Sequence, residues 1–132
     1  MEKFQVALVD DHKIVRYGIK LMLEMENIAV VGEASTGAEA AEMFKQCSPD
    51  LAILDIQLPD SSGLDVARAL RKDYPSVKIL FVTMFDIAQY MDELSSLGVE
   101  GYIPKTAPPK ELLSAVQRIL NGGRFFDFTP SK

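Results

Sequence analysis

The stretch LAILDIQLPDSSG, residues 51–63, decides the fold of this chain. It opens with the apolar run Leu51–Leu54, which is typical of a strand buried on both faces of a parallel sheet. Asp55 ends that run, and a loop carrying Pro59 and Gly63 follows it. Burying a carboxylate is costly unless charged or polar groups compensate it. The sequence therefore predicts that Asp55 meets such groups where the strand stops.

Short apolar runs alternate with segments of helical periodicity along the whole chain. The runs lie at residues 4–9, 29–33, 51–54, 79–83 and 101–103, and the helical segments at residues 14–23, 38–47, 64–70, 87–94 and 112–120. Alternation of this kind indicates right-handed crossovers and helices on both faces of a parallel sheet. We predict an α/β fold, a doubly wound, flavodoxin-like, five-stranded parallel sheet of order 2-1-3-4-5 with five helices. Pro104 should place the fifth strand at a sheet edge, because proline cannot donate to a ladder.

The bulk composition fits one domain of 132 residues. We expect this domain to occupy residues 1–124, with residues 125–132 as a tail or the start of a linker. A net charge of −5 argues against direct nucleic-acid binding by this chain. The sequence has no apolar stretch long enough for a membrane span and no signal-peptide pattern. The single cysteine, Cys47, suits a reducing compartment, so we expect a cytoplasmic protein.

Polar side chains collect at the ends of the predicted strands. Asp10 and Asp11 end the first strand, Asp55 the third, Thr83 the fourth and Lys105 the fifth. The carboxyl ends of parallel strands meet at one edge of the sheet, where such folds bind ligands. The sequence thus predicts three carboxylates, a hydroxyl and an ammonium in one pocket.

Three carboxylates repel one another, and a hard divalent cation such as Mg²⁺ would relieve that repulsion through oxygen ligands. We predict Asp10, Asp11 and Asp55 as its ligands, completed by the backbone carbonyl of Gln57. Asp55 could then act as a nucleophile toward a phosphoryl group and form an aspartyl phosphate. Phosphoryl transfer mainly needs positioning and charge neutralisation. The Lys105 ammonium would supply part of the latter.

The residues that carry this pattern resemble a known family over nearly the whole chain. They are ALVDDHKIVRYGI (7–19), LAILDIQLPDSSGLD (51–65), ILFVTMFD (79–86) and GYIPKT (101–106). The chain resembles the CheY-like receiver domain of two-component response regulators. The resemblance implies these roles: phosphoacceptor for a sensor histidine kinase, Asp55; magnesium-binding pair, Asp10 and Asp11; phosphate-binding lysine, Lys105; switch hydroxyl and switch aromatic, Thr83 and Tyr102.

Two segments, DDHKIVRYGI and AVQRILNGGRFF, resemble the NarL/FixJ subgroup. Its members carry a C-terminal LuxR-type helix-turn-helix domain, which this sequence lacks. The resemblance implies that phosphorylation moves the face formed by the fourth helix, the fifth strand and the fifth helix. That movement would control a homodimer or a DNA-binding output that regulates transcription. It also implies a protein that is not a turnover enzyme beyond self-phosphorylation and self-dephosphorylation.

Thr106 and Phe85 depart from the family pattern, whereas His12 agrees with the subgroup. Thr106 follows Lys105 where many receivers have proline, so the sequence leaves the isomer of the Lys105–Thr106 bond open. Phe85 is apolar where a polar residue can orient hydrolytic water, which predicts slow self-dephosphorylation. His12 is expected to begin the first helix rather than to bind metal.

Other classes of protein remain as alternatives. A flavodoxin-like mononucleotide binder would need a phosphate loop after the first strand, but the Asp10-Asp11 pair would repel phosphate. An aspartate-nucleophile phosphatase would have an acid/base aspartate where Gln57 stands. A stand-alone receiver, or a pseudo-receiver acting as a protein-binding module, stays open.

Overall fold

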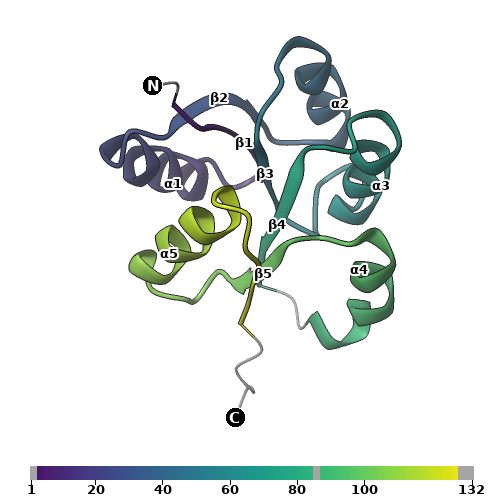
Figure 1. The fold of residues 1–132 in the computed structure, drawn as a ribbon. Coiled ribbons are helices and arrows are strands. Elements are labelled where there is room, and N and C mark those ends of the chain that lie inside the picture. Colours follow the sequence, from purple (N-terminus) through teal and green to yellow (C-terminus); the bar gives the residue numbers. More distant parts are fainter. Residues whose placement is uncertain (1–2, 85–86, 128–132) are drawn as a thin grey trace.

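The computed structural model describes residues 3–84 and 87–127 (Figure 1). In chain order the elements are β1 (Gln5–Val9), α1 (Lys13–Met25), β2 (Ala29–Ala34), α2 (Gly37–Gln46), β3 (Leu51–Leu54), α3 (Gly63–Asp73), β4 (Lys78–Thr83), the 3-10 turn η1 (Ile87–Tyr90), α4 (Met91–Leu97), β5 (Gly101–Pro104), α5 (Pro109–Leu120) and β6 (Phe125–Phe126). The predicted α/β fold with its five α-helices is confirmed within these ranges. None of the helices described is long and apolar enough to cross a membrane.

Within the described residues the sheet has six parallel strands in the order β2-β1-β3-β4-β5-β6. The prediction of five strands was wrong, because Phe125 and Phe126 add a short strand beside β5. Gly122, at φ +95°, helps to turn the chain back after α5. The amide of Phe125 then donates to Glu100 O at 3.1 Å, and that of Asp127 donates to Tyr102 O at 3.0 Å.

The expected edge position of β5 was therefore also wrong. β6 pairs with Gly101 and Tyr102 only, so Pro104 lies beyond that pairing and its missing N–H costs nothing there. The domain boundary at residue 124 stays a prediction, although the next two residues pair with the sheet. No peptide bond in the described residues is cis, so the Lys105–Thr106 bond is trans.

Helices cover both faces of the sheet, as Figure 1 shows: α1 and α5 lie on one side, and α2, α3 and α4 on the other. Alternate residues of the central strands face the two layers. Ala7, Val9, Ala52, Leu54, Ile79 and Phe81 pack toward α2–α4, and Val6, Leu8, Leu51, Ile53, Leu80 and Val82 toward α1 and α5. Every one of these side chains is nearly or fully buried. This double burial explains why the strands read as unbroken apolar runs.

Local signals set several of the helix ends at the two edges of the sheet. Thr36 caps α2 through a bond from Glu39 N, at 3.0 Å. Ser62 and Asp65 form a capping box at the start of α3. Gly98 ends α4 in the left-handed conformation, at φ +60°. These ends fix the loops that follow β2 and β3 and the short connection that precedes β5.

Candidate functional site

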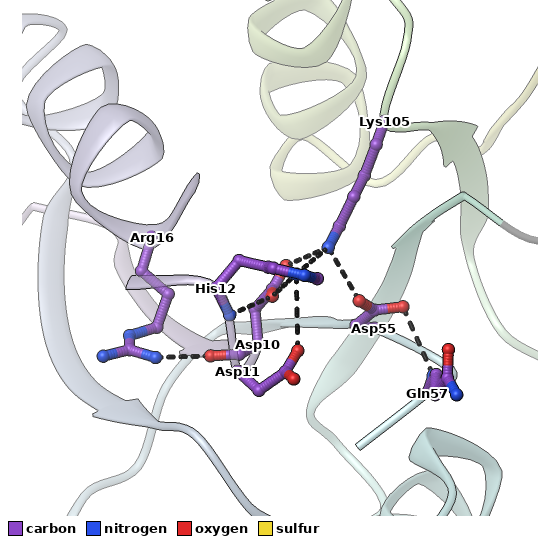
Figure 2. A network of polar contacts seen from close by, with 7 residues as sticks. All are labelled: Asp10, Asp11, His12, Arg16, Asp55, Gln57 and Lys105. Atoms are coloured by element: carbon purple, nitrogen blue, oxygen red, sulfur yellow. Dashed lines mark hydrogen bonds and ion pairs between the residues drawn. The ribbon is translucent and has the colours of Figure 1, made fainter. Parts of the chain in front are cut away.

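Three strand ends bring Asp10, Asp55 and Lys105 into direct contact, although they are far apart in sequence (Figure 2). Lys105 Nζ lies 2.8 Å from Asp10 Oδ2 and 2.7 Å from Asp55 Oδ2. The three side chains are only 7%, 8% and 5% exposed for Lys105, Asp10 and Asp55. The free-energy cost of burying the Asp55 carboxylate is therefore offset, because its charge is paired with and hydrogen-bonded to the Lys105 ammonium.

Lys105 is held in its charged form by these partners. Burial disfavours the charged ammonium, but the hydrogen bonds that it donates to Asp10 and Asp55 and the charges of both carboxylates outweigh that effect. The pKa of Lys105 is therefore raised above its ordinary value of 10.5. The site thus contains a fixed positive charge at neutral pH.

Asp11 and His12 form the exposed rim of the same cluster. His12 Nδ1 lies 3.1 Å from Asp10 Oδ1, 3.3 Å from Asp11 Oδ1 and 2.9 Å from Lys105 Nζ. Potential ligand atoms of Asp10, Asp11, His12 and Asp55 all lie within 4.8 Å of one another. His12 begins α1 as its N-cap, as predicted, and its ring also contacts the charged groups of the cluster.

The donor set of this cluster fits a hard divalent cation. Three carboxylates face one ammonium, so negative charge is in excess, and two of the carboxylates are buried. Mg²⁺ prefers oxygen ligands and keeps several waters, which the exposed rim at Asp11 permits. Gln57 lies beside the cluster, and its backbone N–H donates to Asp55 Oδ1 at 3.3 Å.

The loop after β3 holds Asp55 through close backbone packing. The amide of Asp55 donates to Val9 O at 2.9 Å, and the amide of Gly63 donates to Ile56 O at 2.6 Å. A Cβ added at Gly63 would lie 1.9 Å from Asp55 O, so only glycine fits there. Gly63, the last residue of the LAILDIQLPDSSG stretch, is therefore required for steric reasons.

The two predicted switch residues, Thr83 and Tyr102, lie on β4 and β5. Thr83 is fully buried at the end of β4, and its carbonyl accepts the Lys105 amide at 3.0 Å. Tyr102 on β5 is 6% exposed and belongs to the apolar layer under α3 and α4, with Phe126 packed against that layer. Phe85, which carries the prediction of slow self-dephosphorylation, lies outside the described residues.

One residue near the site was not foreseen from sequence. Arg16 on α1 donates from Nη1 to the backbone carbonyl of Asp10 at 2.5 Å. Its Nε also donates to Glu33 Oε1 on β2 at 3.2 Å. A faint signal exists, because Arg16 follows His12 by one helical turn and thus lies on the same side of α1.

Comparison with known proteins agrees with this geometry. A family model described as the response regulator receiver domain matches residues 6–117. The chain belongs to this family. The recognition made from the sequence motifs is thereby confirmed.

Similar receiver-containing proteins are of the NarL, NreC and DegU types. The chain is 37% identical, over 122 residues, to a nitrate/nitrite response regulator protein homolog of Haemophilus influenzae, covering 92% of this chain and 59% of that protein. It is 34% identical over 125 residues to the oxygen regulatory protein NreC of Staphylococcus carnosus, covering 93% and 58%. The chain therefore spans little more than half the length of these curated relatives.

Solved receiver domains share the fold closely. The isolated receiver domain of RcsB from Salmonella enterica serovar Typhimurium superposes with a TM-score of 0.87 at 25% identity, covering 96% of this chain and 94% of that one. The receiver domain of the putative response regulator NarL from Mycobacterium tuberculosis gives 0.84 at 32% identity, covering 92% and 99%. The chain is thus a response-regulator receiver domain of the NarL/LuxR type.

Proposed function

We propose that this receiver domain accepts a phosphoryl group on Asp55 from a sensor histidine kinase. The observation that carries the proposal is the contact of Lys105 Nζ with both Asp55, at 2.7 Å, and Asp10, at 2.8 Å. Asp10, Asp11 and Asp55 would hold Mg²⁺, together with the backbone carbonyl of Gln57. When bound, the cation would neutralise charge on the transferring phosphoryl oxygens.

The side chains of the site suit each part of the transfer. A carboxylate oxygen of Asp55 forms the bond to phosphorus while the bond from phosphorus to the donor's histidine nitrogen breaks, and the electron pair leaves with the imidazole. Lys105 already lies beside the attacking carboxylate and can pair with phosphoryl oxygens. The Thr83 hydroxyl donates to a phosphoryl oxygen.

We propose that the phosphoryl group then shifts an equilibrium between two packings. Drawing the Thr83 hydroxyl inward changes the space available to Tyr102. Tyr102 is buried in this structure, which corresponds to the packed end of the proposed rotation. Because Tyr102 lies in the layer with α4 and β6, its movement would alter the face formed by α4, β5 and α5.

A protein donor is supported by the surface beside the site. Four large apolar side chains line the outer face of α1 at helical spacing and are 87%, 62%, 45% and 84% exposed: Ile14, Tyr17, Leu21 and Met25. Exposed apolar surface of this extent is typical of an interaction site. The stripe begins one turn from the site, and we propose that the kinase docks there.

The output is proposed from the relatives. We infer that the full-length protein regulates transcription through a C-terminal DNA-binding domain and that this chain does not itself bind nucleic acid. RcsB has been solved as dimers bound to DNA, which supports a homodimer here. Slow self-dephosphorylation, the absence of other turnover and a cytoplasmic location belong to the same proposal.

The test is incubation with Mg²⁺ and acetyl phosphate, followed by intact-mass measurement. We expect a gain of one phosphoryl group that Asp55→Asn abolishes. Asp60→Asn, in the same loop but bonded to α2, is the matched control and should keep the gain. A wild-type chain that gains no mass would favour the pseudo-receiver alternative, and a gain that survives Asp55→Asn would refute Asp55 as the acceptor.

A further inference from the structure

We propose that Arg16 is a positioning residue for the metal-binding pair, acting through the peptide that joins Asp10 to Asp11. This inference rests on the proposed function. The side chain of Arg16 is only 14% exposed, so it is packed rather than free in solvent. Figure 2 shows its guanidinium beside the backbone of Asp10, with a dashed line to the Asp10 carbonyl oxygen.

The contacts of Asp10 show what Arg16 adds. The amide of Asp10 donates to Ala34 O at 3.0 Å. Its Oδ1 accepts the His12 amide at 2.8 Å, and its Oδ2 contacts Lys105 Nζ. Arg16 donates to the remaining polar atom, the backbone carbonyl. Together these bonds hold both the side chain and the backbone of Asp10.

The carbonyl bond also orients Asp11. The carbonyl of Asp10 and the amide of Asp11 lie in one rigid plane, so fixing the first fixes the direction in which the chain enters Asp11. The carboxylate of Asp11 is 34% exposed, and its Oδ1 lies 3.3 Å from Nδ1 of the exposed His12 ring. The direction in which the Asp11 carboxylate points therefore depends strongly on the orientation of the Asp11 backbone.

The charge of Arg16 would by itself oppose a nearby cation, but Glu33 compensates it. Arg16 Nε lies 3.2 Å from Glu33 Oε1, and Lys20 contacts the other oxygen at 3.5 Å. A guanidinium can donate to Glu33 and to Asp10 at once through its planar fork, whereas a lysine ammonium is a single point on a flexible stem. The geometry therefore requires arginine specifically, not merely a positive charge.

The expected effect is on metal affinity. Partners that orient metal ligands commonly change affinity about tenfold or more when removed. We expect Arg16→Gln and Arg16→Lys each to raise the dissociation constant for Mg²⁺ about tenfold. Glu33→Gln should raise it less, because Arg16 remains but loses its anchor. Lys20 contacts Glu33 and not Asp10, so Lys20→Ala should leave the dissociation constant for Mg²⁺ unchanged.

The experiment is calorimetric titration of the purified chain with Mg²⁺ and no phosphodonor, with circular dichroism to verify folding. The Mg²⁺ concentration for half-maximal acetyl phosphate modification should rise in parallel, while the rate at saturating Mg²⁺ stays near that of wild type. The inference would be overturned if Arg16→Gln bound Mg²⁺ with wild-type affinity. It would also be overturned if only Arg16→Lys did so, because a positive charge at this position would then be enough. If Arg16→Gln does not fold, Glu33→Gln decides by the same titration. Failure of the wild-type chain to bind Mg²⁺ would instead refute the proposed function, and this inference with it.

Discussion

Two half-buried charge clusters lie at opposite edges of the sheet, and they are built differently. At the carboxyl edge, Lys105 is shared by the side chains of Asp10 and Asp55. At the amino edge, Arg71 at the end of α3 donates to the backbone carbonyls of Val77, Leu97 and Gly98 at 2.6, 2.8 and 3.0 Å. It also donates to a side chain, Glu100 Oε1, at 2.8 Å.

The difference teaches what each cluster can do. The partners of Arg71 are mostly backbone atoms, and Glu100 is itself bonded to the Ile79 amide at 2.8 Å. They cannot move without moving α4 or β4. The partners of Lys105 are side chains, which can rotate while the backbone stays fixed; under the proposed function they would exchange the ammonium for a metal cation. The Arg71 cluster therefore stabilises the fold, whereas the charge contacts of the Lys105 cluster can rearrange.

Breaking the amino-edge cluster should have the largest effect on stability. Arg71→Ala leaves three carbonyls and Glu100 without their donor, and buried polar groups that lose a partner are costly. We expect the free energy of unfolding to fall by about 3–4 kcal/mol. Urea denaturation followed by circular dichroism measures it.

Arg68 provides the matched control for Arg71 on the same helix. It pairs with Asp65 and Glu93 at the surface, with its side chain 50% exposed. Exposed pairs of this kind contribute about 1 kcal/mol or less, so Arg68→Ala should cost little. Equal losses in the two variants would show that anchoring to the backbone is not what matters.

The carboxyl-edge cluster should respond to the ions in solution, unlike the Arg71 cluster. Lys105→Met leaves Asp10 and Asp55 buried side by side, so without divalent cations we expect a loss of about 2–3 kcal/mol. Saturating Mg²⁺ should restore most of that stability, because it compensates the same carboxylates.

The measurement for Lys105→Met is urea denaturation in chelator and in Mg²⁺. Arg71→Ala, measured in parallel, should show no comparable recovery. A loss in Lys105→Met that is the same in both buffers would mean that the carboxyl edge is as rigid as the amino edge.

Much of the carboxyl edge was predictable because topology alone brings it together. Apolar runs buried on both faces identify β1, β3 and β4, and a parallel sheet must then collect the residues after them at one edge. Asp10 and Asp55 follow such runs and Lys105 follows the shorter run of β5, so their contact required no knowledge of side-chain paths. The helix ends at Thr36 and Gly98 also depend on local residue chemistry, a side-chain oxygen in one case and a left-handed glycine in the other.

The rest depends on long-range partners that no local pattern shows. β6 is only two residues, and it forms because β5 offers a free edge after α5 turns back. Arg71 binds the carbonyls of Leu97 and Gly98, which lie 26 and 27 residues further along the chain, and a carbonyl is present at every residue. Arg16 was missed for the same reason, since its partner at Asp10 is the backbone rather than the carboxylate.

The smallest expected effect tests whether backbone bonding alone fixes a charge when burial is absent. Asp60 is exposed, yet it accepts the amides of Gly37 and Ala38 at 2.8 and 3.0 Å, linking the Asp55 loop to the start of α2. Those two backbone bonds lower the pKa of Asp60 from its ordinary value of 3.8. A carboxyl whose folded pKa is lowered stabilises the fold above its unfolded pKa, and that contribution is lost as pH falls through the folded value. At neutral pH the melting temperature of Asp60→Ala should therefore be slightly below that of wild type. The difference between the two melting temperatures should narrow only below pH 3.8. Asp60→Asn keeps one acceptor oxygen, so its melting temperature should lie between those of Asp60→Ala and wild type. An NMR titration of the Asp60 carboxyl carbon checks the cause directly, since a midpoint at or above 3.8 would mean that exposed backbone bonds do not hold this charge.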